Sequence, residues 1–135
     1  MLKARALDHV GLKVTDMNRS LAFYCDGLGL KLLRRKDSGP GTATAVLAVG
    51  EQEMNLFSNP SFAAGPGFAA GAESGNPPGL DHFCLEIEAA SIDELMAALA
   101  QAGIAIAKPP VKRSDGVSLF VSDPDGCRVE LIVKN

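Results

Sequence analysis

The stretches LDHVGLKV at residues 7–14 and LDHFCLEI at residues 80–87 are two copies of one motif. Leucine, aspartate, histidine and the second leucine match position for position, and the two copies lie about half a chain apart. Two copies with a single junction are too few for a solenoid, which needs at least three stacked repeats. The repeat therefore indicates the duplication of one compact module.

The same order of elements is predicted after each copy. Thr15-Asp16 is a helix-capping signal, and the apolar positions that follow at helical spacing end at Gly27 and Gly29. After the second copy, residues 91–94 (SIDE) form a capping box, and the helix ends at Gly103. The strand-like segments that follow the two helices are 31–35, 42–49, 51–57, 104–108, 117–121 and 128–133.

These patterns predict the fold class α+β, with two βαβββ modules in one domain that spans residues 1–135. The first module is expected over residues 5–57 and the second over 80–134. Residues 58–79 are rich in Gly, Pro, Ala and Ser, which is typical of a linker or a functional loop.

Composition excludes several classes of function. The chain has a net charge of −3 and no long basic stripe, which argues against binding to nucleic acid or to an anionic membrane. No apolar run approaches the roughly 20 residues of a membrane span, and the N-terminus lacks the apolar region of a signal peptide. Three cysteines without a CxxC pair suit a reducing compartment, so we expect a cytoplasmic protein.

Side-chain alternation along the strands indicates a candidate site. His9 and His82 both lie opposite the apolar face of their strand, at equivalent places in the repeat. Alignment of EMNLF at 53–57 with RVELI at 128–132 makes Asn55 equivalent to Glu130. Two neutral imidazoles and one carboxylate are a metal-ligand set with open coordination positions. The competing interpretation is that these are inherited repeat positions that hold no metal.

The chain resembles the vicinal oxygen chelate superfamily, which groups glyoxalases, bleomycin-resistance proteins and extradiol dioxygenases. The resemblance rests on LDHVGLKVTDMNRSLAFYCDGLGL at 7–30, on the second copy of the repeat, and on LFVSDPDGCRVELI at 119–132. It implies two modules whose sheets curl around one open cavity, with the helices outside. It also implies a homodimer in which the site lies within one chain or is shared between two.

The resemblance implies that His9, His82 and Glu130 bind a divalent metal ion, with Zn, Ni, Mn and Fe equally compatible. Asn55 stands where glyoxalase I carries glutamate. Its amide oxygen is a weak fourth ligand and is not a base at neutral pH.

The function implied is that of a lactoylglutathione-lyase-like lyase or isomerase, which stabilises an enolate or enediolate of a small substrate with vicinal oxygens. Glu130 is then both a metal ligand and the catalytic group that moves the proton. A non-haem Fe(II) extradiol-type dioxygenase, a metal-free drug-binding protein and a fosfomycin-resistance type of thiol transferase remain alternatives.

Three further residues are candidates for binding the small-molecule substrate. Phe57 lies two residues after Asn55 and shares its strand face, and Phe120 lies opposite a set of apolar neighbours. Arg113, expected in a loop after Pro109-Pro110, is placed to meet an anionic group of the substrate. Ordinary packing or solvation is the competing interpretation for all three.

Overall fold

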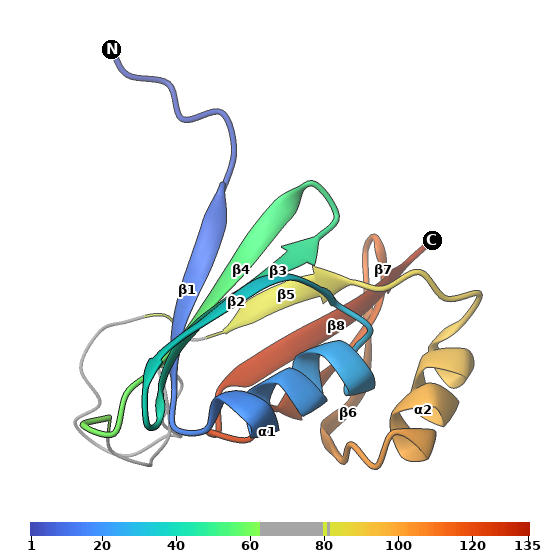
Figure 1. Cartoon of the computed structure of the whole chain (residues 1–135). Helices are drawn as coiled ribbons and strands as arrows, with labels where there is room; N and C mark the ends of the chain where they lie inside the picture. Colours follow the sequence, from blue (N-terminus) through green and yellow to red (C-terminus); the bar gives the residue numbers. More distant parts are fainter. Residues whose placement is uncertain (63–79, 81) are drawn as a thin grey trace, which may run out of the picture.

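The computed structural model describes residues 1–62, 80 and 82–135. All strands in this part of the chain belong to two open four-stranded sheets (Figure 1). The first sheet comes from the first repeat copy and the second sheet from the second copy. In chain order the elements are β1 (His9–Val14), α1 (Met17–Leu21), the π-helical turn η1 (Ala22–Gly27), β2 (Lys31–Gly39), β3 (Thr42–Val49), β4 (Gln52–Ser58), β5 (Phe83–Glu86), α2 (Ile92–Gln101), β6 (Ile106–Arg113), β7 (Gly116–Ser122) and β8 (Arg128–Lys134).

The two sheets have the same topology. Their strand orders are β1-β4-β3-β2 and β5-β8-β7-β6. In each sheet the first strand runs parallel to the last, and the remaining pairs are antiparallel. This duplicated mixed arrangement confirms the predicted α+β fold class, whereas the enclosed cavity stays a prediction.

Side chains that point to one face of each sheet form a shared apolar core. The alternation expected from the sequence holds in β1, where Leu12 and Val14 are buried while His9 and Lys13 are exposed. The helix α1 packs against β3 and β4 of the first sheet, and α2 packs against β6 of the second. The largest fully buried apolar side chains of the core are Tyr24, Leu12, Leu47, Met54, Leu56, Leu119, Leu131, Val14, Val121 and Val129.

The helices begin at the expected caps. Asp16 Oδ1 accepts a hydrogen bond from the Arg19 N–H at 3.0 Å at the start of α1. Ser91 Oγ accepts from the Glu94 N–H at 3.2 Å, and the Glu94 carboxylate accepts from the Ala90 N–H at 2.6 Å. Each bond satisfies a backbone donor at or near a helix start that has no partner within the helix.

Substitution of Ser91 with alanine is expected to lower the free energy of unfolding by about 1 kcal/mol, because the Glu94 N–H loses its acceptor. Chemical denaturation of the two proteins measures this difference. Ser114→Ala, in an exposed turn, is the matched control and should change stability by less than about 0.5 kcal/mol. Equal effects of the two substitutions would contradict the assigned cap.

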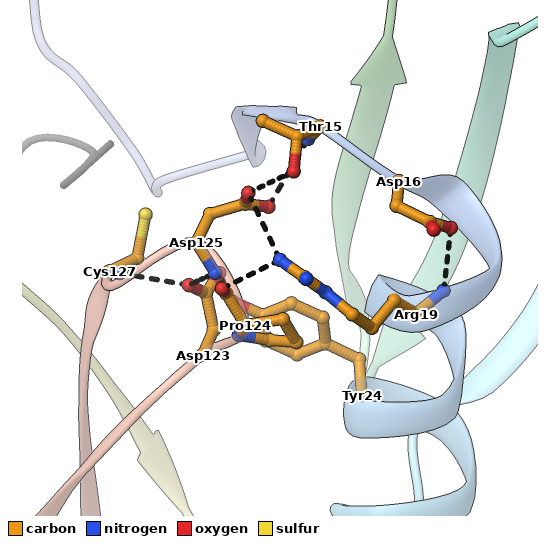
Figure 2. A network of polar contacts seen from close by, with 8 residues as sticks. All are labelled: Thr15, Asp16, Arg19, Tyr24, Asp123, Pro124, Asp125 and Cys127. Carbon is orange, nitrogen blue, oxygen red and sulfur yellow. Dashed lines mark hydrogen bonds and ion pairs between the residues drawn. The ribbon is translucent and has the colours of Figure 1, made fainter. Parts of the chain in front are cut away.

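A buried polar network, here called the Asp123 clasp, joins the first helical segment to the turn between β7 and β8 (Figure 2). Tyr24 Oη donates to Asp123 Oδ2 at 2.8 Å, and Asp123 Oδ1 accepts from the backbone N–H groups of Asp125 and Cys127. Burial and the Asp123 carboxylate raise the pKa of Tyr24 well above its usual value, so its hydroxyl stays a donor.

Two further residues of the first repeat copy, Thr15 and Arg19, bind the same turn. Thr15 donates to the Asp125 carboxylate through both its hydroxyl and its backbone N–H. Arg19 donates to the Pro124 carbonyl at 2.8 Å and lies 3.7 Å from the Asp125 carboxylate. The clasp therefore connects residues of the two repeat copies that are about a hundred positions apart in sequence.

The predicted loop position of Arg113 is wrong, because Arg113 is the last residue of β6. Pro109 and Pro110, which suggested a loop, lie inside this strand at a register shift between Lys108 and Val111. Proline lacks an N–H and is tolerated on edge strands, and β6 is the edge of its sheet. The strand therefore continues through the prolines, and Arg113 lies at its end within the sheet.

The predicted linker over 58–79 falls mostly on residues 63–79, which lie outside the described residues, and Ser58 belongs to β4. None of the helices in the described part of the chain is long and apolar enough to cross a membrane.

Candidate functional site

The two histidines occupy equivalent places relative to the last strand of each sheet. Gly11, two residues after His9, pairs with Asn55 of β4. Cys84, two residues after His82, pairs with Glu130 of β8. His9 begins β1, and His82 precedes β5 by one residue. The alignment that made Asn55 equivalent to Glu130 thus agrees with the strand register.

In the second sheet this geometry brings a histidine and a carboxylate together. His82 Nε2 lies 3.0 Å from Glu130 Oε2. The Glu130 side chain is only 5% exposed, because its strand is the one between β5 and β7. Arg113 donates from its guanidinium to the other carboxylate oxygen, Oε1, at 2.6 Å. A buried carboxylate is therefore held between an imidazole and a guanidinium, which offset the cost of burying its charge.

The turn before β8 fixes the position of this carboxylate. The Asp123 N–H donates to the Cys127 carbonyl at 2.9 Å, and the Gly126 N–H donates to the Asp123 carbonyl at 3.0 Å. Gly126 has a φ of 85°, a conformation that favours glycine. Glu130 follows four residues after this glycine, so the turn sets where β8 begins and where its side chains point.

In the first sheet the equivalent residues are arranged differently. His9 is exposed, and its Nδ1 lies 2.8 Å from the Asp8 carboxylate. Asn55 Oδ1 is buried and has no hydrogen-bond partner among the described residues. A buried polar atom without a partner is costly, so this oxygen is available to accept a hydrogen bond or to bind a cation.

The described residues of one chain do not bring the predicted ligands into a single cluster. Within residues 1–62, 80 and 82–135, no group of three histidine, cysteine, aspartate or glutamate side chains is arranged to hold a metal ion. His82 and Glu130 meet within the chain, and His9 does not join them. Completion of the predicted set therefore needs a change of conformation or a second copy of the chain.

The donor types nevertheless suit a divalent ion. An imidazole beside a buried carboxylate is a common pair of ligands, and the unpartnered oxygen of Asn55 adds a neutral one. Cys84 is paired with Glu130 in the strand register. Desolvation, and then the Glu130 carboxylate, raise the pKa of its thiol to about 11, so in the absence of a metal ion the thiol is protonated at neutral pH.

Two predicted substrate contacts lie beside these residues. The Phe120 ring meets the His82 ring edge-to-face with centroids 5.2 Å apart, and its Cα is paired with that of Glu130. Phe57 is 41% exposed, and its ring lies next to Gly11, where an added Cβ would be 3.3 Å from it. An aromatic side chain therefore borders the histidine-bearing strand in each sheet.

Two features of the site are not predictable from the sequence pattern. Lys108 Nζ lies 5.6 Å from the centroid of the Phe120 ring, which is within the range of a cation–π contact. Arg113 is bound to Glu130, whereas the sequence suggested only a substrate contact for it. The available signal was the short basic pattern of residues 108–113, which does not indicate which carboxylate it meets.

Comparison with known proteins identifies the family. Residues 6–131 match the sequence profile of the Glyoxalase/Bleomycin resistance protein/Dioxygenase superfamily. The chain belongs to this superfamily. It shares 34% identity over 128 residues with a Synechocystis sp. protein named "Probable lactoylglutathione lyase", a match that covers 92% of each chain. It shares 33% identity over 141 residues with "Lactoylglutathione lyase" of Salmonella typhimurium, which covers 92% of this chain and 89% of that one.

Solved structures of the superfamily have the same fold. The crystal structure of a glyoxalase family protein from Enterococcus faecalis superposes with a TM-score of 0.75 at 26% identity, covering 95% of this chain and 97% of that one. The superfamily resemblance seen in the sequence is thereby confirmed.

Proposed function

We propose that this glyoxalase-superfamily chain is a divalent-metal-dependent lyase or isomerase of the lactoylglutathione-lyase type. Its substrate is a small molecule with two adjacent oxygens and a C–H bond beside them. The observation that carries the proposal is the buried Glu130 carboxylate with its Oε2 3.0 Å from His82 Nε2. The relatives named lactoylglutathione lyase, which match over nearly their whole length, support it.

The residues proposed to hold the ion are His82 and Glu130 with His9, and Asn55 as a weak fourth ligand. A bound divalent ion would supply a fixed positive charge next to the oxygens on which negative charge develops. Phe57 and Phe120 are proposed to line the space for the substrate. The aromatic rings exclude water and thereby strengthen electrostatic interactions at the reacting carbon.

Glu130 is the proposed base. Its Oε2 accepts the proton from the substrate carbon that carries the hydroxyl group, the C–H electron pair forms a C=C bond, and the carbonyl π pair moves to the carbonyl oxygen, so that an enolate forms. Return of this proton to the former carbonyl carbon, together with transfer of the hydroxyl proton to the enolate oxygen, completes an isomerisation and regenerates the carboxylate. Transfer in both directions by one carboxylate needs an oxygen that is not held by Arg113, and Oε2 is that oxygen.

The site is proposed to form between two copies of the chain. Within the described residues of one chain His9 does not join His82 and Glu130, so a second copy's His9 and Asn55 would complete the set. The unpartnered oxygen of Asn55 and the exposed ring of His9 are then both used. This arrangement requires a homodimer with two equivalent sites.

Equilibrium dialysis against zinc, nickel, manganese and iron(II) tests the metal proposal. Wild-type protein is expected to bind close to one ion per chain. His82→Ala should lose more affinity than the roughly 10- to 100-fold that loss of a supporting hydrogen-bond partner costs, because a ligand itself is removed. Equal metal uptake by both proteins would contradict the proposal. Absence of uptake by wild type would favour a metal-free binding protein.

Mixed dimers distinguish a shared site from one within a single chain. If the site is shared, a dimer of one His9→Ala chain and one His82→Ala chain contains one intact site, whereas wild type paired with the double variant contains none. If the site lies within one chain, the two results are reversed. The two chains carry different tags so that heterodimers can be purified, and dialysis against metal then measures the number of ions bound per heterodimer.

An extradiol-type dioxygenase would also use a tyrosine near the substrate, and the tyrosine of this chain does not meet that requirement. Tyr24, the only tyrosine of the chain, is buried in the Asp123 clasp and donates to Asp123. It is therefore not placed to contact a substrate near His82.

A further inference from the structure

We propose that Arg113 is a positioning residue, which holds Oε1 of Glu130 so that only Oε2 serves the metal ion and the substrate proton. The inference rests on the proposed function and adds a role for one of its side chains. It predicts that Arg113 weakens metal binding while it speeds turnover.

The geometry divides the two carboxylate oxygens between different partners. Oε1 accepts from the Arg113 guanidinium at 2.6 Å, and Oε2 faces His82 Nε2 at 3.0 Å. A charge-assisted bond of this length is strong and directional. A carboxylate held in this way can reach a metal ion with one oxygen only, since two-oxygen binding would require Oε1 to leave the guanidinium.

Arg113 is well suited to this task by its place in the sheet. It lies at the end of the edge strand β6, two strands away from β8, and its side chain is half exposed while that of Glu130 is buried. Arginine keeps its charge at all ordinary pH values and presents several N–H donors in a rigid plane. In the absence of metal the positive charge of Arg113 therefore balances the negative charge of Glu130, and the ion pair holds the carboxylate in one orientation.

The same charge opposes a divalent cation at Oε2. Removal of Arg113 abolishes this repulsion and frees Oε1 to bind the ion, and both changes favour tighter metal binding. A carboxylate that coordinates the ion with both oxygens accepts a proton less readily, so turnover should fall. A residue that only stabilises the fold would lower metal affinity and turnover together, which makes the opposite signs diagnostic.

The test uses the full-length protein and the variants Arg113→Met, Arg113→Lys and Lys112→Met. Lys112 is the neighbour of Arg113 in β6 and points to the other face, so its replacement removes one positive charge without touching Glu130. Metal affinity is measured by competition dialysis with manganese, and the metal environment by electron paramagnetic resonance of the bound manganese. Turnover is measured on the same preparations as the formation of lactoylglutathione from its hemithioacetal isomer, and thermal unfolding checks that each variant is folded.

Arg113→Met is expected to bind manganese about tenfold more tightly than wild type and to turn over at least about tenfold more slowly, a modest change typical of a half-exposed charge. Its resonance spectrum should change, because Glu130 then binds with two oxygens. Arg113→Lys, which keeps the charge, should stay within about threefold of wild type in affinity, and Lys112→Met should match wild type.

Equal or weaker manganese binding by a folded Arg113→Met protein overturns the inference while the proposed function stands. Tighter binding with unchanged turnover overturns the positioning role. Absence of manganese binding by wild type and by all variants overturns the proposed function and the inference with it.

Discussion

Replacement of Glu130 with glutamine is expected to lower the rate of lactoylglutathione formation by roughly 100- to 10,000-fold, the usual contribution of a general base. Glutamine has almost the same shape, and its amide oxygen can still accept from Arg113, so the fold should persist. The amide has no basic oxygen for the substrate proton and is a weaker metal ligand. The gain of thioester absorbance as lactoylglutathione forms from its hemithioacetal isomer measures the rate, with the metal content of each preparation determined in parallel.

Glu86→Gln is the matched control for this substitution. Glu86 lies on β5, two residues beyond the Cys84 that pairs with Glu130, and its side chain is exposed. Its loss removes the same charge from the same sheet, and turnover should stay within about threefold of wild type, as is usual for exposed positions away from a reaction centre. If the Glu130→Gln protein turned over at the wild-type rate, Glu130 would not be the base.

The internal repeat made most of the fold predictable. Matching histidine-bearing strands and matching capped helices require two similar sheets, and β3 agrees with its predicted residues 42–49. The strand β6 was underestimated because proline normally interrupts a strand. Whether Pro109 and Pro110 are tolerated depends on β6 lying at a sheet edge, which is a property of the neighbouring strands rather than of the local sequence.

The candidate site was only partly predictable for a similar reason. Alternation along the strands places His82 and Glu130 opposite the apolar core, and their contact follows from the parallel pairing of β5 with β8. The contact of Arg113 with Glu130 depends on two strand registers and on side-chain torsions, which no sequence spacing specifies. Whether His9 meets His82 within one chain or across two depends on how modules associate, which is also a tertiary property.

The Asp123 clasp shows the same limit most clearly. The residues DPDG at 123–126 predict a turn, and Tyr24 lies among the apolar positions at helical spacing that follow Asp16. Their partnership joins positions 99 residues apart, so local pattern gives no sign of it. A buried hydroxyl needs a partner, however, and this requirement explains why a turn aspartate points inward.

Replacement of Asp123 with alanine is expected to lower the free energy of unfolding by about 3–5 kcal/mol. The substitution leaves the Tyr24 hydroxyl and the Cys127 N–H without their acceptor, and each unsatisfied buried group costs about 1–3 kcal/mol. In a chain of this size the melting temperature should fall by roughly 10–20 °C. Calorimetry and chemical denaturation measure the two quantities.

Graded variants separate the bonds within the clasp. Tyr24→Phe removes one donor and keeps both backbone bonds of Asp123, so it should cost only about 1–2 kcal/mol. Asp93→Ala, an exposed aspartate in the first turn of α2, should cost under about 1 kcal/mol and serves as the matched control. If Asp123→Ala cost no more than Asp93→Ala, the clasp would not hold the two repeat copies together. If Asp123→Ala lowered the free energy of unfolding strongly and Tyr24→Phe only slightly, most of the stabilisation would come from the bonds of Asp123 to the backbone of the turn that positions β8 and Glu130.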